Sequence, residues 1–198
     1  MNFFNKHIKN RFFTSSKKYW ESRYSTGENS GDGSYNDYAK YKADFINQII
    51  KKYKIKTVTE LGCGDANNLK LYRGFDKYYG FDVSQTVINK NKNEFDSKHI
   101  FKILKNSTLP KCDLYMSLDV IYHLVENVVF KNHIEQLFSN KSKYVLIYSS
   151  NHSSFRNFHV KHRKWTKYVP KNYTLIERTN KGFLNSSAMF FLYEREIQ

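Results

Sequence analysis

One segment limits the possible folds of this chain more than any other: a short β-rich run that leads directly into two closely spaced glycines. The run covers Thr57–Leu61, and Gly62 and Gly64 follow it with a single cysteine between them. Glycine lets the backbone turn sharply and approach a ligand closely, so the pattern predicts a strand that ends in a ligand-binding turn. A plain turn would contain the same glycines, so the surrounding residues must decide between the two.

Short β-rich runs then alternate with polar, helix-compatible segments along the chain. This alternation predicts an α/β fold with a mostly parallel, doubly wound sheet that has helices on both faces. The runs expected to form the parallel strands are Thr57–Leu61, Tyr78–Phe81, Ile100–Leu104, Leu114–Leu118 and Tyr144–Tyr148. Two later runs, Thr174–Arg178 and Ala188–Glu194, flank a turn signal at Asn180-Lys181-Gly182. We expect these two to add an antiparallel terminal pair and to complete a seven-stranded sheet.

The part of the chain before the first strand contains two expected helices and a loop. Residues 1–20 are basic, free of acids and apolar at helical spacing, so we prefer an amphipathic helix leading into the domain over a targeting segment. Ala39–Tyr53 repeats apolar residues every three or four positions, with Lys residues elsewhere, and predicts a second helix. The Ser- and Gly-rich stretch Ser25–Ser34 predicts a flexible loop between them.

Composition narrows the class of protein. The 198 residues include 33 Lys and Arg against 18 Asp and Glu, and this net charge of +15 attracts phosphorylated substrates, nucleic acid or an acidic surface. Cys63 and Cys112 form neither a disulfide framework nor a metal-ligand spacing, so we expect a cytoplasmic protein. No apolar run approaches the roughly 20 residues of a membrane span, so we expect no integral membrane association.

An acidic residue follows the second predicted strand. Asp82 comes directly after Tyr78–Phe81, and a carboxylate there can accept hydrogen bonds from both ribose hydroxyls of an adenosine. Together with Glu60 in the first strand, it favours a nucleotide-type ligand over a plain turn. A dehydrogenase fingerprint would need a third glycine where Asn67 stands, so nicotinamide binding is disfavoured.

The segment Glu60–Ala66 resembles the first motif of the class I S-adenosylmethionine-dependent methyltransferases, with Ala66 in place of the last glycine. The resemblance implies a Rossmann-like fold, S-adenosylmethionine (SAM) as cofactor and S-adenosylhomocysteine (SAH) as product. It implies that Asp82 holds the ribose and that Val83 packs on the adenine. The residues that it assigns to the cofactor in this part of the chain are Glu60, Gly62, Gly64, Asp65, Asp82, Val83, Asn106 and Ser107.

The segment Asp113–Leu124 resembles the fourth strand and following helix of the same family. That strand's carboxyl end faces the methyl group in the family, which implies that Asp119 meets the cationic methionine moiety. A helix N-cap is the structural alternative for Asp119. His123 is the candidate general base, since neutral imidazole accepts a proton at physiological pH, and packing alone is its alternative. Asp119 and His123 are thus the catalytic candidates.

Upstream, the segment Tyr19–Tyr24 resembles one that precedes the core and covers the cofactor in many small-molecule methyltransferases. The rings of Tyr19, Trp20 and Tyr24 could hold a sulfonium by cation–π attraction while excluding water, or could pack as ordinary helix residues. The resemblance divides a single domain into an N-terminal helix and lid, residues 1–38, and a methyltransferase core, residues 39–198.

The candidate acceptor side follows the fifth strand. Between Glu135 and Glu177 there are eight Lys and Arg and no acid, which indicates either a solvated charged face or an anion-binding pocket. In an extended loop, alternate side chains would face opposite ways, so only one set could meet a substrate. No Cys or carboxylate accompanies the histidines here, so we expect no metal site. The candidate substrate-binding residues are Asn151, His159, His162 and Arg163.

Three segments, Asp119–Leu124, Tyr148–Asn151 and His159–Trp165, resemble bacterial methyltransferases encoded with surface-polysaccharide genes, including those linked to O-methyl phosphoramidate capsule modification. This resemblance implies methyl transfer to a small, anionic or phosphate-containing acceptor. Two alternatives stay open. One is an RNA methyltransferase that uses the basic surface, and the other is a non-enzymatic basic binding protein on a methyltransferase scaffold.

Overall fold

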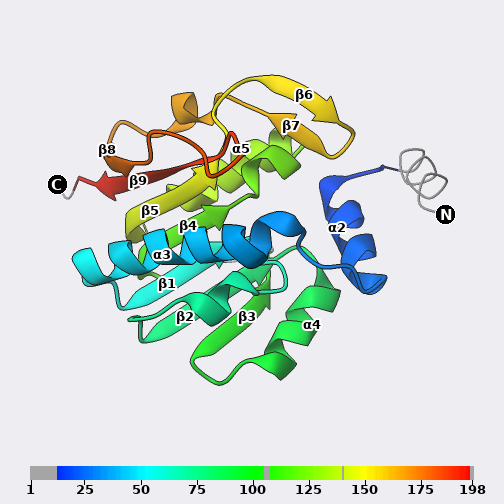
Figure 1. The fold of residues 1–198 in the computed structure, drawn as a ribbon, viewed down its shortest axis with the longest axis horizontal. Helices are drawn as coiled ribbons and strands as arrows, with labels where there is room; N and C mark the ends of the chain where they lie inside the picture. Colours follow the sequence, from blue (N-terminus) through cyan, green and yellow to red (C-terminus); the bar gives the residue numbers. More distant parts are fainter. Residues whose placement is uncertain (1–12, 105–107, 140, 197–198) are drawn as a thin grey trace.

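A computed structural model describes residues 13–104, 108–139 and 141–196. A seven-stranded sheet in the order β3-β2-β1-β4-β5-β9-β8 runs through its centre (Figure 1). Strands β1 to β5 pair in parallel, whereas β9 is antiparallel to both β5 and β8. The strands are β1 (Thr57–Leu61), β2 (Lys77–Asp82), β3 (His99–Ile103), β4 (Cys112–Leu118), β5 (Ser142–Ser149), β8 (Tyr173–Arg178) and β9 (Met189–Arg195). The predicted α/β sheet with an antiparallel terminal pair is confirmed.

Helices cover both faces of the sheet. The α-helices are α2 (Ser16–Ser25), α3 (Asn36–Lys52), α4 (Gln85–Glu94) and α5 (Asn127–Leu137), and the short 3₁₀ turns are η1 (Asp32–Ser34), η2 (Asn68–Leu71), η3 (Ile121–His123) and η4 (Trp165–Tyr168). One apolar cluster joins α3 and α4 to the sheet, and a second joins α5 and η4 to the opposite face. The fold is therefore a three-layer, doubly wound arrangement.

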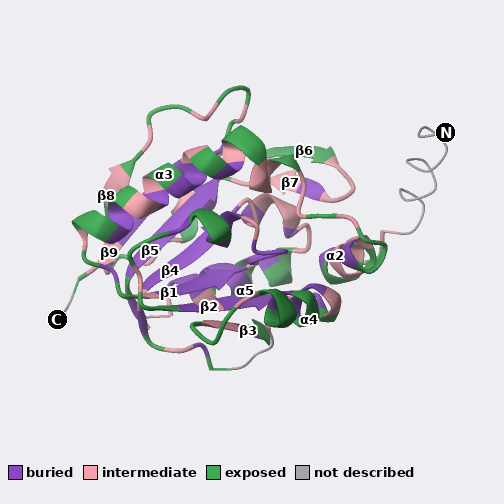
Figure 2. Ribbon diagram, turned by 60° about the horizontal axis from the view of Figure 1, so that its bottom comes forward, coloured by how far each residue is buried: buried purple, intermediate pink, exposed green. Residues whose placement is uncertain are grey.

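Alternation along the central strands explains the two clusters. In β5, Leu146 and Tyr148 pack in the cluster with α3 and α4, while Val145 and Ile147 pack in the cluster with α5. Successive side chains of a strand point to opposite faces, so a strand covered on both sides is apolar throughout. Figure 2 shows the central strands as buried.

The basic segment after β5 forms a hairpin, where the sequence suggested an extended loop. Its strands β6 (Ser154–Asn157) and β7 (Val160–His162) pair antiparallel with an irregular register between Phe155 and Asn157. The hairpin lies beside α2 at one end of the sheet (Figure 1), and Tyr19 of α2 stacks on His159 at a centroid distance of 4.6 Å. Two segments far apart in the sequence thus meet above the carboxyl ends of the strands.

The N-terminal helices differ in part from their predictions. Most of the predicted helix of residues 1–20 lies outside the described residues. The described part of this segment contains the start of α2, which begins at Ser16 and is capped by Ser15. The predicted helix Ala39–Tyr53 is α3, but one of its lysines, Lys42, is buried. Within the described ranges, no helix is both long and apolar enough to cross a membrane.

Candidate active site

A cavity occupies the place where a sheet of this topology binds ligands. Strand order reverses between β1 and β4, so the two connections leave in opposite directions and a crevice opens at the carboxyl ends. The cavity there has a volume of about 460 Å³. Its lining includes Gly62 after β1, Asp82 at the end of β2 and Asp119 after β4. Sequence placed all three in the site, and the structure brings them together.

The turn after β1 needs both of its glycines. Gly62 and Gly64 have φ angles of 84° and 53°, in the left-handed region that favours glycine. A Cβ on Gly62 would lie 2.4 Å from Val120 Cγ2, and a Cβ on Gly64 would lie 2.3 Å from Ser30 Oγ. The Gly62 N–H donates to the Phe81 carbonyl oxygen at 2.7 Å and ties the turn to β2. The turn therefore brings bare backbone to the cavity wall.

Asp82 ends β2 and is buried. Its carboxylate accepts hydrogen bonds from the Gly64 N–H at 3.0 Å and the Ser84 N–H at 2.9 Å. Burial raises the pKa of Asp82 to about 6, although these backbone donors favour the ionised form. A carboxylate has about four acceptor sites, so it can still accept hydroxyl donors from a ligand.

Glu60 lies one residue before the end of β1 and faces the same cavity. It is buried, and the Tyr78 hydroxyl donates to its Oε2 at 2.6 Å. Burial raises the pKa of Glu60 to about 7, against the effects of this hydrogen bond and the nearby Lys42 charge. The carboxyl groups of Glu60 and Asp82 are thus weaker acids than usual. In their ionised forms they attract a cation to the cavity.

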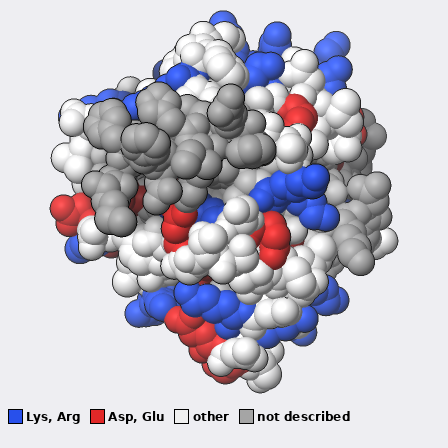
Figure 3. Space-filling model, turned by 90° about the vertical axis from the view of Figure 1, so that its right-hand side faces the viewer, with Lys and Arg blue, Asp and Glu red and all other residues white. Residues whose placement is uncertain are grey.

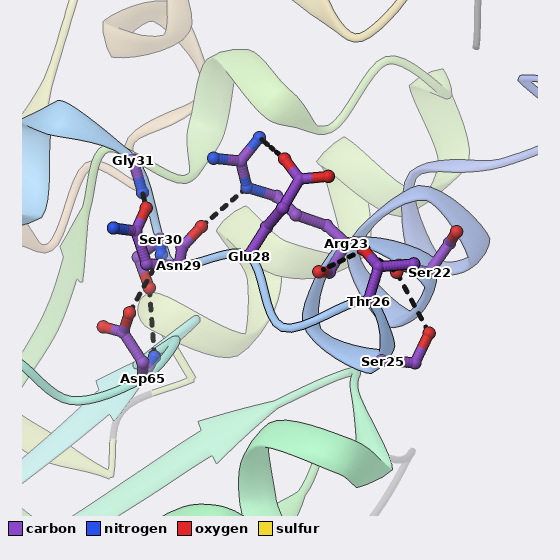
Figure 4. A network of polar contacts seen from close by, with 9 residues as sticks. All are labelled: Ser22, Arg23, Ser25, Thr26, Glu28, Asn29, Ser30, Gly31 and Asp65. Carbon is purple, nitrogen blue, oxygen red and sulfur yellow. Dashed lines mark hydrogen bonds and ion pairs between the residues drawn. The ribbon is translucent and has the colours of Figure 1, made fainter. Parts of the chain in front are cut away.

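Asp65 latches the loop after α2 onto the glycine turn. The Ser30 N–H donates to Asp65 Oδ2 at 2.9 Å, and the Asp65 N–H donates to Ser30 Oγ at 3.0 Å (Figure 4). The Tyr35 hydroxyl donates to the same Oδ2 at 2.7 Å. Arg23 holds the other part of the loop through the Asn29 carbonyl oxygen at 2.6 Å. The stretch expected to be a flexible loop is tied at several points, and Asp65 is not among the cavity-lining residues.

Helix α2 presents aromatic rings to the cavity. Trp20 stacks on Tyr24 at 5.8 Å and meets the edge of His123 at 5.0 Å. Tyr19, Trp20 and Tyr24 all line the cavity. The helix is anchored at its first residue, because the N–H of buried Ser16 donates to Glu126 Oε1 at 2.8 Å.

Asp119 follows β4 and is held in a fixed direction by two side chains. The Lys42 ammonium lies 2.6 Å from its Oδ2, and the Tyr122 hydroxyl donates to its Oδ1 at 2.7 Å. Asp119 has a φ of 59°, an uncommon conformation for a residue with a side chain. The Lys42 side chain is only 1 % exposed, so the pair is largely removed from water. Asp119 therefore presents a partly neutralised carboxylate to the cavity.

The role of Lys42 as the partner of Asp119 was not predicted, although the spacing of the apolar residues in α3 indicates it. The buried residues of α3 include Ala39, Lys42, Ile46 and Ile49, which recur at intervals of three or four. A lysine in the middle of an apolar helix stripe must meet a buried acid, since an unpaired buried charge is costly. This spacing would have pointed to a partner in the sheet.

His123, in η3, is positioned as a neutral base. Its Nδ1 lies 3.1 Å from the His159 carbonyl oxygen, and because a carbonyl only accepts, Nδ1 carries the proton and Nε2 keeps its lone pair. Burial lowers the pKa of His123 to about 4. His159 stacks nearly parallel on the ring at 5.7 Å. Both residues line the cavity.

Arg163 does not line the cavity, in contrast to its expected substrate-binding role. Its guanidinium donates to the carbonyl oxygens of Leu124 at 2.7 Å and Val125 at 2.6 Å. It also lies over the Phe130 ring at 4.6 Å. These contacts hold the segment between η3 and α5 and use the guanidinium donors that a substrate would need.

The other acceptor candidates are divided between the cavity and its surroundings. Asn151 exchanges hydrogen bonds with Thr166 and lies outside the lining, and so does His162, whose Nδ1 lies 2.5 Å from Ser150 Oγ. Asn106 and Ser107 lie outside the described residues. The predicted residues that line the cavity are Tyr19, Trp20, Tyr24, Glu60, Gly62, Gly64, Asp82, Val83, Asp119, His123 and His159.

Helix α5 contributes lining residues that no motif indicated. Val129, Asn132 and Gln136 line the cavity from one side of the helix. Their spacing of three and four residues places them on one face. Two amide side chains four residues apart, on the same helix face as Val129, could have suggested a ligand-facing surface.

Comparison with known proteins places this geometry in a fold. No family model matches the chain, and no curated protein matches its sequence. Solved structures do match. N-methyltransferase NodS from Bradyrhizobium japonicum WM9, in complex with SAH, aligns with a TM-score of 0.68 and 13% identity over 91% of this chain and 98% of that one. The chain has a methyltransferase fold.

Two further structures support the same conclusion. Magnesium protoporphyrin IX methyltransferase (ChlM) from Synechocystis PCC 6803, with bound SAM, aligns with a TM-score of 0.67 and 14% identity over 91% of this chain and 97% of that one. Small RNA methyltransferase HEN1 aligns with a TM-score of 0.63 and 15% identity over 86% of this chain and 27% of that one. At these identities the likeness establishes the fold, and the activity must be argued from the site.

Proposed function

We propose that the protein binds SAM and transfers its methyl group to a small acceptor. The observation that carries this proposal is that one cavity joins two kinds of group. The glycine turn and Asp82 lie on the side of β1 and β2, and Asp119 and His123 lie on the side of β4 and η3. This arrangement suits a ligand with a nucleoside at one end and a reactive, cationic centre at the other.

The chain offers a matching group for each part of the cofactor. Asp82 would accept the ribose hydroxyls, and Val83 beside it would pack on the adenine. Glu60 and Asp119 would attract the positively charged methionine part. Residues 13–38, with the rings of α2, would act as a lid that excludes water. Asn106 and Ser107 keep their predicted place at the adenine edge as part of this proposal.

The bound cofactor would supply an electrophilic methyl group on a sulfonium. The protein's own contribution is then mainly to hold a nucleophile in line and close to that methyl group. His123 Nε2 would take the acceptor's proton when the nucleophile is neutral, and the His159 carbonyl fixes the tautomer that makes this feasible. Tyr122 and Lys42 hold the Asp119 carboxylate in place.

We further propose a small anionic acceptor, on the basis of the acid-free basic segment. The Lys and Arg side chains of this segment do not line the cavity. Among the described lining residues, Arg23 is the only Lys or Arg. The anion would therefore be held at the rim. A role in surface-polysaccharide biosynthesis and a cytoplasmic location remain predictions that rest on the sequence.

Two measurements test this function. Titration calorimetry with SAM, SAH and, as a control, NAD should show binding of the first two with one site per chain. A screen of phosphorylated metabolites, nucleotide-sugars and RNA should then show SAH release with one small acceptor. Absence of SAM binding would contradict the proposal and would favour the non-enzymatic binding protein.

RNA methylation is the second candidate, because the chain carries a net charge of +15. Figure 3 views the end of the molecule that carries α2 and the hairpin and shows Lys and Arg at its top, right of its centre and across its lower part, with Asp and Glu among them. Binding to a phosphate backbone releases counterions, so turnover on RNA would fall steeply with salt. Salt-sensitive turnover on RNA alone would replace the small-molecule proposal by this one.

A further inference from the structure

Three basic side chains outside the cavity lining lie near Tyr122. They are His152, Arg156 and His162, which we call the basic cluster. His152 lies in the loop before the hairpin, Arg156 on β6 and His162 at the end of β7. None of the three lines the cavity, and none serves the proposed methyl transfer directly. Of these three residues, only His162 was predicted to bind the substrate.

The rings of this region form a connected row from the cavity to the cluster. Tyr122 lines the cavity, and the centroid of its ring lies 4.7 Å from that of His123 and 5.4 Å from that of His162. His152 meets the edge of His162 at 4.7 Å. The distance between the candidate base and the cluster is thus spanned by the Tyr122 ring.

The side chains of the cluster have donors to spare. Arg156 is exposed and makes no hydrogen bond or ion pair with any described residue. His162 uses Nδ1 towards Ser150 Oγ, and its Nε2 makes no hydrogen bond within the described part of the chain. A guanidinium fork commonly binds phosphate, and His162 Nε2 can donate to the same group when Nδ1 accepts from the Ser150 hydroxyl.

Arg156 gives this region a positive charge, and no described carboxylate pairs with it. Partial burial lowers the pKa of His162, and the charges of His152 and Arg156 lower it further. The Arg156 charge also reaches Tyr122, where it partly offsets the rise in pKa that burial and Asp119 cause. Between Glu135 and Glu177 the sequence has no acid that could pair with the cluster. A lowered pKa leaves His162 neutral at physiological pH, so Arg156 supplies the positive charge for a bound anion and the imidazole can supply a hydrogen bond.

We propose that the basic cluster binds a phosphate group of the methyl acceptor. This inference rests on the proposed methyl transfer. The acceptor's nucleophile would lie by His123 and its phosphate by Arg156 and His162, on the two sides of Tyr122. The acceptor class is therefore a phosphorylated small molecule with about one ring between nucleophile and phosphate. Arg163, whose donors are used by backbone carbonyls, has no part in this site.

Inorganic phosphate is a probe that does not require the acceptor to be known. Histidine side-chain NMR signals would be followed during titration of the full chain with phosphate at constant pH, against sodium chloride of equal ionic strength. We expect saturable shifts of the His152 and His162 signals, assigned from His152→Gln and His162→Gln. Arg156→Ala should weaken phosphate binding by about tenfold, as loss of a charged hydrogen-bonding partner does.

Lys171→Ala is the matched control, since Lys171 is an exposed cation of the same acid-free segment. It should leave phosphate binding unchanged. Equal losses in Lys171→Ala and Arg156→Ala, or no saturable shift of His152 and His162, would overturn the proposal. Calorimetry with SAM on the same samples separates the two hypotheses. SAM binding without phosphate binding defeats the cluster alone, whereas phosphate binding without SAM binding defeats its assignment to a methyl acceptor.

Discussion

The two sides of the cavity are built in different ways. On the donor side, formed by the turn after β1 and the end of β2, the groups are backbone N–H donors and buried carboxylates fixed by strand ends. On the acceptor side, formed by α2, η3 and the β6–β7 hairpin, the groups are half-buried rings. The rings are oriented by partners from distant segments, such as His123 by the His159 carbonyl.

This difference indicates which part of the fold can change its specificity for the methyl acceptor. The donor side depends on the sheet, so altering it disturbs both the binding site and the fold. The acceptor side depends on side chains carried by a hairpin and a helix outside the sheet. It can therefore be remodelled for a new acceptor while the donor side stays the same.

The largest expected effect comes from Asp82→Asn, which tests the donor side. The amide loses the charge that accepts from Gly64, Ser84 and the ribose, so SAM affinity should fall about 100-fold by calorimetry. Asp76→Asn is the control: Asp76 is exposed and directly precedes β2, so this variant should bind SAM normally. Retention of full affinity by Asp82→Asn would remove the ribose role.

Gly64→Ala tests whether the donor side needs bare backbone. Its Cβ would lie 2.3 Å from Ser30 Oγ and 2.8 Å from the Tyr24 hydroxyl, so the loop must shift and SAM affinity should fall about tenfold. Gly27→Ala is the matched control, because Gly27 has a φ of 80° but no atom near the added Cβ.

Both variants should lower the free energy of unfolding by about 1 kcal/mol, but only Gly64→Ala should weaken SAM binding. Adding Ser30→Gly to Gly64→Ala removes the closest obstacle and should recover part of the affinity. An equal loss of affinity in Gly27→Ala would mean that backbone strain, and not the close approach, is responsible.

The raised pKa values of the donor-side carboxyls predict how SAM affinity depends on pH. Burial raises the pKa of Glu60 to about 7 and that of Asp82 to about 6, and a cationic ligand prefers both groups ionised. Affinity should therefore fall as pH drops through this range, by at most about tenfold per pH unit for each carboxyl. Calorimetry between pH 5 and 8 measures it, and Asp82→Asn should lose the part near pH 6. A flat profile would contradict the role of both acids.

Arg163→Met tests whether Arg163 on the acceptor side has a structural role, and it has the smallest expected effect on function. Loss of the bonds to Leu124 and Val125 and of the contact with Phe130 should lower the free energy of unfolding by about 1–3 kcal/mol in urea denaturation. Lys164→Met, at the exposed neighbour, should change stability little. Unchanged stability with a large rise in the acceptor KM would restore Arg163 as a substrate residue.

The same contrast explains which parts the sequence could predict. The strand Thr57–Leu61 was predicted with the bounds observed, because strand, glycine turn and acid are signals of local sequence. Asp82 followed from its position at a strand end, since parallel strands bring their carboxyl ends to one edge. Asp119 followed from the resemblance of Asp113–Leu124 to the methyltransferase family.

The acceptor side could not be predicted in the same way. The hairpin was expected as an extended loop, since its pairing depends on a bulge between Phe155 and Asn157 that no turn signal marks. The direction of Arg163 depends on carbonyls of Leu124 and Val125, about 40 positions away in the chain. Long-range partners of this kind leave no local pattern.

A crystal structure of the complex with SAH tests the central claim most directly. The ribose hydroxyls should lie within hydrogen-bond distance of the Asp82 carboxylate, and the sulfur should face the side of Asp119 and His123. A ligand bound elsewhere, or a ribose held by groups other than Asp82, would contradict it.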